Sequence, residues 1–135
     1  LRTVYRLPAT TLTFRCYQNM FANCSSLTTV PSNMLPATTL ADYCYAFMFK
    51  GCTSLTAAPV LPATTLAEWC YAEMFNGCSN LNNITCLATD ISANNCTYYW
   101  VNDVALSGIF TKAASMTGWT TGYNGIPSEW IIQNA

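Results

Sequence analysis

The chain has 135 residues, which is enough for one domain with a continuous core. Only 8 % of the residues are charged, the net charge is −1, and the five basic residues are scattered, which argues against nucleic acid as a partner. No apolar run approaches the ~20 residues of a transmembrane helix, and 13 % aromatic residues are too many for a disordered chain. Thr, Ser and Asn supply the polar surface, as in many extracellular proteins. The composition therefore favours an extracytoplasmic globular domain that does not span a membrane.

An internal repeat dominates the first 96 residues. The string LPATTL recurs at 7–12, 35–40 and 61–66. Each copy is followed by a cysteine, a tyrosine, a Met-Phe pair and a second cysteine. The first cysteines lie 28 and 26 residues apart, and the same period predicts a cysteine at position 96, which is present and begins a fourth, atypical unit. Residues 1–12 align with 55–66, so we expect the chain to open inside an earlier unit, and its open N-terminal end implies further repeats upstream, a removed cap or a partner.

Each unit predicts one short strand and one helix. The segments 27–31 and 55–59 favour short strands, because Thr suits a strand and Pro ends it. Leu40, Cys44 and Met48 recur at i, i+4 and i+8, as on the buried face of a helix. Capping residues mark the helix ends: Thr39 with Asp42, Thr65 with Glu68, and then Gly51 and Gly77. The period falls in the range of leucine-rich repeats, so we predict an α/β, right-handed leucine-rich-repeat solenoid.

The C-terminal part of the chain departs from the repeat. Short strands are predicted around 104–111, 119–123 and 130–133, separated by Gly, Asn and Pro turn signals. A solenoid end has to be covered to hide its core and its free strand edge. We therefore predict a solenoid over 1–96 and a β-rich capping segment over 97–135, within one structural domain.

Units of the form LPATTLAxxCYxxMFxGCTSLTxAP resemble the BspA-like leucine-rich repeats of surface and secreted proteins from gut Bacteroides and their relatives. The resemblance extends into the tail, at CLATDISANNC, GIFTKAASMTGW and GIPSEWIIQNA. It implies a leucine-rich solenoid, an extracytoplasmic location, and a role in adhesion or ligand binding. The family has no catalytic motif to transfer.

The eight cysteines allow three interpretations. Zinc sites usually contain close C-x2–4-C pairs, whereas the spacing within each unit is C-x7-C and the chain has no histidine, so we predict no metal site. Disulfides within a unit, such as Cys16–Cys24, remain an alternative. Cysteines in a column along a solenoid point the same way, which places their Cβ atoms ~4.8 Å apart and opposes bridging. We therefore favour free, buried thiols.

No catalytic constellation can be named. The chain has no histidine to act as a base for a Ser or Cys nucleophile, and the six carboxylates form no motif. Glu68 and Glu73 are five residues apart, a poor fit to one helix face. No glycine-rich phosphate loop is present. We therefore predict a protein that is not an enzyme and has no cofactor.

Variation between the units indicates a candidate binding surface. The position before the first cysteine is occupied by Arg15, Tyr43 and Trp69, and the position four residues later by Asn19, Phe47 and Glu73. On the predicted helix these positions form one outward stripe. Two interpretations stay open: a site for a ligand, or bulky side chains that shield each other between units.

The predicted function is a non-catalytic surface or secreted module that binds a protein or glycan, for example one from a host. The alternative is a structural spacer or tip module of a larger surface protein, fibre or phage-like appendage, in which the repeats only supply length.

Overall fold

The computed structural model describes residues 4–135, and it contains no α-helix in that range. The predicted leucine-rich-repeat solenoid, with one helix per unit, is therefore wrong. Three short strands are present: β1 (Asn83–Cys86), β2 (Ile109–Lys112) and β3 (Ile131–Asn134). Residues 1–3 of the partial first unit lie outside the described residues. No helix that is long and apolar enough to cross a membrane occurs among the residues described.

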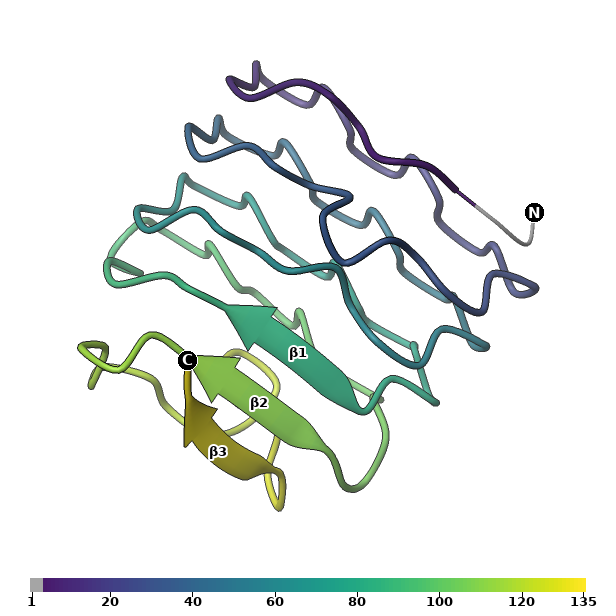
Figure 1. Cartoon of the computed structure of the whole chain (residues 1–135), viewed down its shortest axis with the longest axis vertical. Helices are drawn as coiled ribbons and strands as arrows, with labels where there is room; N and C mark the ends of the chain where they lie inside the picture. The colour runs from purple at the N-terminus through teal and green to yellow at the C-terminus, as the bar shows by residue number, and fades with distance from the viewer. Residues whose placement is uncertain (1–3) are drawn as a thin grey trace.

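The chain winds into a stack of rungs, one per repeat, that lie side by side from the N-terminal to the C-terminal end (Figure 1). The three strands form one parallel sheet in the order β1-β2-β3, with Ile84 opposite Phe110 and Phe110 opposite Ile132. Isolated parallel bridges, such as Ala57 with Asn83, continue this side of the stack toward the N-terminus. We call it the strand side.

The predicted strands match the structure only in part. The segment 27–31 forms no strand, and 55–59 contributes only the bridge at Ala57. In the tail, β2 overlaps the predicted strand at 104–111 and β3 overlaps the one at 130–133, whereas 119–123 contributes a single bridge from Thr121 to Ile126. β2 and β3 lie in register with β1, so the tail is stacked on the repeats through backbone hydrogen bonds.

The segments predicted to be helical are ladders of overlapping turns. We call 14–23, 42–51, 68–77 and 94–103 the turn segments, and together they make the turn side. Within one segment, alternate N–H groups donate to the carbonyl three residues back, as Cys44 does to Ala41 at 3.2 Å. The remaining N–H groups donate to the next rung, as Tyr45 does to Cys70 at 3.0 Å. The backbone is thus satisfied partly by the neighbouring rung, whereas a helix satisfies it alone.

Every fourth residue of a turn segment has a left-handed backbone. In the second unit these are Tyr43 (φ 60°), Phe47 (φ 60°) and Gly51 (φ 76°). Gly51 and its counterpart Gly77 are therefore left-handed residues of the ladder, not helix C-caps. Asp42 is not a helix cap either, because its side chain accepts a hydrogen bond from the N–H of Glu68 in the next rung at 3.1 Å.

The ladder explains why the helix prediction failed. Its buried side chains recur every four residues, as at Cys44, Met48 and Cys52, all of which are fully buried. A helix repeats every 3.6 residues, and over two or three turns the two periods produce the same pattern.

Columns of identical side chains fill the interior between the two sides. Tyr17, Tyr45 and Tyr71 stack with ring centroids 5.9 and 6.0 Å apart. Phe49 and Phe75 form a parallel column at 5.9 Å. All eight cysteines are free, and six of them are buried: Cys44, Cys52, Cys70, Cys78, Cys86 and Cys96. The core is therefore continuous along the stack.

Candidate binding surface

The five residues proposed from the sequence all occupy left-handed positions of the turn ladder. Arg15, Tyr43 and Trp69 form the first left-handed column, with φ of 59°, 60° and 57°. Phe47 and Glu73 belong to the second left-handed column, with φ of 60° and 50°. A left-handed backbone costs a residue other than Gly or Asn about 1–2 kcal/mol. These columns therefore carry local strain.

The first left-handed column is brought together by stacking. The rings of Tyr43 and Trp69 lie parallel, with an interplanar angle of 2° and centroids 5.6 Å apart. The guanidinium of Arg15 lies 5.2 Å from the centroid of Tyr43 and 4.8 Å from that of Phe14. At the other end of the column, the ring centroids of Trp69 and Tyr98 lie 5.2 Å apart. Tyr43 and Trp69 are half-buried, and Arg15 is exposed.

Stacking along the column leaves the ring edges for a partner. The faces of Tyr43 and Trp69 are turned toward each other, so a sugar ring cannot lie flat on the face that each uses for the other. What the column can present is ring edges, the Tyr43 hydroxyl, the Trp69 indole N–H and the Arg15 guanidinium. Such a surface suits apolar contact combined with hydrogen bonds.

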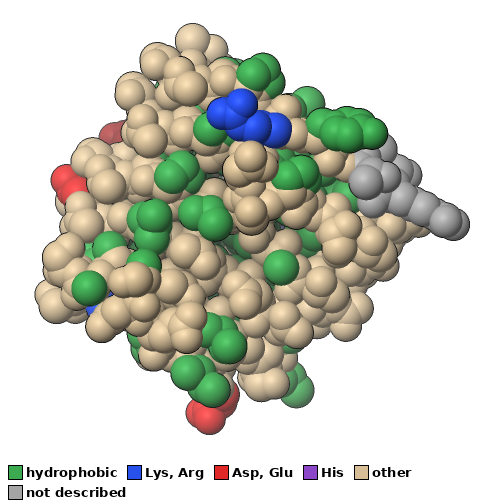
Figure 2. Space-filling view, in the orientation of Figure 1, with side chains coloured by type: hydrophobic (Ala, Val, Ile, Leu, Met, Phe, Trp, Pro, Cys, Tyr) green, Lys and Arg blue, Asp and Glu red, His purple; other side chains and the backbone are tan. Residues whose placement is uncertain are grey.

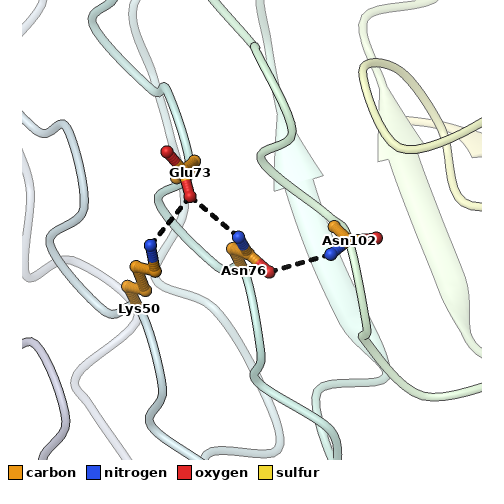
Figure 3. A network of polar contacts seen from close by, with 4 residues as sticks. All are labelled: Lys50, Glu73, Asn76 and Asn102. Atoms are coloured by element: carbon orange, nitrogen blue, oxygen red, sulfur yellow. Dashed lines mark hydrogen bonds and ion pairs between the residues drawn. The ribbon is translucent and has the colours of Figure 1, made fainter.

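The second left-handed column is joined by a polar network (Figure 3). The ammonium of Lys50 lies 5.4 Å from the ring centroid of Phe47 and donates to Glu73 Oε1 at 2.9 Å. Asn76 donates to the same oxygen at 2.9 Å and accepts from Asn102 at 3.1 Å. The network ties together three rungs, so Glu73 already has partners within the chain.

Electrostatics at Glu73 agree with this structural role. Partial burial raises the pKa of Glu73, but the hydrogen bonds from Lys50 and Asn76 outweigh it and leave the pKa below its ordinary value of 4.5. The carboxylate is thus stabilised in its charged form by Lys50 on the adjacent rung and by Asn76 on the same rung.

The buried thiols behind these columns are poor nucleophiles. Burial raises the pKa of Cys44, Cys78 and Cys86 to about 12. The thiols of Cys52 and Cys78 donate to the carbonyls of Phe21 and Phe49 in the preceding rungs, at 3.1 and 3.0 Å. A thiol reacts as a thiolate, so these groups act as core residues with a weak hydrogen bond. Within residues 4–135, no group of three His, Cys, Asp or Glu side chains is arranged to hold a metal ion.

The face that carries the strands has its large exposed apolar side chains, Ile131 and Ile132, in β3 at the C-terminal end of the stack. Figure 2 shows apolar side chains scattered in small separate spots among neutral polar surface, with few charged groups. Large exposed anchors are what a protein interface usually needs at its centre. The turn side is therefore the stronger candidate surface.

A cleft at the C-terminal end was missed by the sequence reasoning. It measures about 510 Å³ and lies between 101–106 and 122–129. Asp103 lines it and has a left-handed backbone (φ 58°) in the column that holds Gly51 and Gly77 in earlier rungs. The change from glycine to an acidic residue in that column is the feature of the sequence that could have pointed to the cleft.

Comparisons of the chain with protein-family models, with curated proteins and with solved structures find no match.

Proposed function

We propose that this chain is a non-catalytic binding module that recognises a protein partner through the first left-handed column, Arg15, Tyr43 and Trp69. One observation carries the proposal. Glycine or asparagine would occupy a left-handed position with less strain than Tyr or Trp, yet two aromatic residues stand there half-exposed. Mutual stacking offsets part of that cost, and strained positions tend to cluster at functional sites.

A protein partner fits the column better than a glycan. Trp, Tyr and Arg are the residue types enriched among interface hot spots. The rings use their faces for each other, at 5.6 Å and 2°, so their edges and polar atoms remain for contact. A glycan that recognises ring faces would find fewer of them here.

The proposed location is outside the cytoplasm, at a bacterial cell surface or in secreted form. The resemblance of the repeats to BspA-like proteins supports this location. The low fraction of charged residues, 8 %, and the surface rich in Thr, Ser and Asn support it as well.

The test uses Tyr43→Asn and Trp69→Asn, which remove the aromatic ring but keep a residue suited to the left-handed backbone. Wild type and variants are applied to arrays of mucins, extracellular-matrix proteins and glycans. We expect wild type to bind at least one protein, and both variants to lose about tenfold or more in affinity, the scale of a hot spot.

The matched control is Phe47→Asn, which removes an aromatic ring at another left-handed position. It should bind as wild type does, and thermal unfolding should show that all three variants are folded. Unchanged binding by Tyr43→Asn and Trp69→Asn would contradict the proposed surface, and binding to glycans alone would contradict the protein partner.

A second candidate is a structural spacer. The regular hydrogen bonding between rungs favours it, because an array of this kind supplies length without a ligand. No binding to any array, together with a large loss of stability in the column variants, would support the spacer.

A further inference from the structure

The stack ends in a rung that covers its neighbour incompletely. Val101 donates to Tyr123 at 3.2 Å, in the manner of the earlier ladder bonds. Beyond this contact the final segment leaves the course of 102–106, and the cleft of about 510 Å³ opens between them. The last rung is shorter than the one before it, with 22 residues from Ile109 to its partner Ile131 against 26 from Asn83 to Ile109, and the cleft lies where it leaves its neighbour uncovered.

The cleft has an apolar part that is open to solvent. Leu106 is 92 % exposed and Tyr123 is 58 % exposed, and both line it together with Val104 and Pro127. Leu106 is thus an almost fully exposed large apolar side chain beside an open aromatic ring. Exposed apolar side chains gathered at a concave site are typical of a binding site.

The cleft also has one sign of charge. Asp103 and Glu129 line it, and no Lys or Arg does. Neither carboxylate has a hydrogen-bond or ion-pair partner among residues 4–135, in contrast to Glu73, which is held by Lys50 and Asn76. Free carboxylates repel an anion and attract a cation.

We propose that this cleft binds an organic cation, an ammonium or guanidinium group on an apolar stem, such as a lysine side chain or a polyamine. The cation would lie against Asp103 and Glu129, and the stem against Leu106 and Tyr123. Charge-assisted hydrogen bonds to carboxylates and attraction to an aromatic face both favour such a group. This site lies beyond the proposed function, since it shares no residue with the first left-handed column.

The first experiment measures binding of pentylamine and of its neutral counterpart 1-pentanol by NMR titration of the whole chain. We expect saturable binding of pentylamine, with shifts at Leu106 and Tyr123, and affinity for 1-pentanol lower by about tenfold or more, as for loss of a charged hydrogen bond. Equal affinities, or no saturable binding of pentylamine, would overturn the proposal.

The second experiment compares Asp103→Asn and Glu129→Gln with the control Asp42→Asn. Asparagine suits the left-handed backbone of Asp103, so the fold should be kept, and thermal unfolding verifies it. Each cleft variant should weaken pentylamine binding by about tenfold, while Asp42→Asn leaves it unchanged. If all three variants bind equally well, the carboxylates are not the site and the proposal is wrong.

The same titration distinguishes the two sources of the cation. N-acetyl-lysine-methylamide stands for a peptide side chain, and spermidine stands for a free polyamine. Tighter binding of the first supports a lysine-bearing partner, tighter binding of the second supports a polyamine, and failure of both overturns the proposal. Tyr43→Asn and Trp69→Asn should bind both probes as wild type does, so the outcome is independent of the protein partner proposed above.

Discussion

The two sides of each rung use their backbone differently. On the strand side the bonds run both ways, since Leu61 donates to Thr85 in the next rung and accepts from Leu87, both at 3.0 Å. On the turn side the bonds run one way, from N–H groups of one rung to carbonyls of the next, as from Phe47 to Ala72 at 2.9 Å. The strand side is an ordinary parallel ladder, whereas on the turn side all backbone bonds between rungs point in the same direction along the stack.

This difference shows where the regularity of the stack comes from. Each of the first three turn segments sends the same set of bonds to the next, whereas the strand side has three four-residue strands and isolated bridges. The turn side also carries most of the left-handed residues and three of the six buried thiols, Cys44, Cys70 and Cys96. Its conformation requires close agreement between neighbouring rungs, which the near-identical repeats provide.

The largest predicted effect is loss of stability in alkali. Burial raises the pKa of Cys44, Cys78 and Cys86 from 9.0 to about 12. Because the pKa is higher in the folded state than in the unfolded state, the protonated thiols contribute fully to stability below pH 9. That contribution to the unfolding free energy is lost as the pH rises from 9 toward 12. Each thiol then costs about 1.4 kcal/mol of unfolding free energy per pH unit. Urea unfolding at pH 7 to 11 measures the loss.

The alkaline experiment also compares a buried thiol beside the turn side with one on the strand side. Cys78 directly follows the turn segment 68–77 and Cys86 is in β1, and burial raises both pKa values alike, so Cys78→Ala and Cys86→Ala should each flatten the pH dependence of the unfolding free energy to a similar degree. A flat profile in the wild type would contradict the burial of these thiols.

The next effect is expected at Trp100, where the two sides meet. Its fully buried ring stacks on Tyr71 at 5.8 Å and on Trp119 at 5.6 Å, and it meets Phe110 of β2 edge-on. Its indole N–H donates to Gly125 at 2.8 Å. Trp100→Ala should lower the unfolding free energy by about 3–5 kcal/mol, measured in urea. A loss below that of the half-buried control Trp69→Asn would show that Trp100 does not join the sides.

A smaller effect distinguishes the turn ladder from a helix directly. Asn19 is exposed and left-handed, with φ 61°. In a helix Ala is more stable than Gly by about 0.5–1 kcal/mol. At a left-handed position the order reverses. We therefore expect the unfolding free energy of Asn19→Gly, measured in urea, to be higher than that of Asn19→Ala by about 1–2 kcal/mol. Greater stability of the alanine variant would contradict the ladder.

The smallest effect concerns the Lys50–Glu73 pair on the turn side. The pKa of Glu73 is lowered, so its contribution is present above its unfolded pKa and is lost as the pH falls through the folded pKa. A double-mutant cycle of Lys50→Met and Glu73→Gln should give a coupling of about 0.5 kcal/mol at pH 7, since solvent screens a Lys50 side chain that is 44 % exposed. The coupling should fall as the pH is lowered through the folded pKa of Glu73, and a constant value across pH would contradict the ion pair.

The candidate site was predictable in part. Comparison of the units singled out Arg15, Tyr43 and Trp69, and the structure brings these three together in one column. Phe47 and Glu73 were placed with them, but they are joined to each other through Lys50 instead. The cleft at Asp103 was not predictable, because it depends on where the last rung diverges from the one before it.

The sequence by itself determined the period of the molecule and the side chains that share a column. Identical residues at intervals of 26 and 28 must meet their copies when the units stack, and the Tyr and Phe columns do so. Only the tertiary structure decided the backbone between them. A four-residue turn ladder and a 3.6-residue helix bury the same positions over a short segment, and they differ in where half of the N–H groups find an acceptor. Those acceptors belong to the next rung, so the sequence of a single unit does not distinguish the turn ladder from a helix.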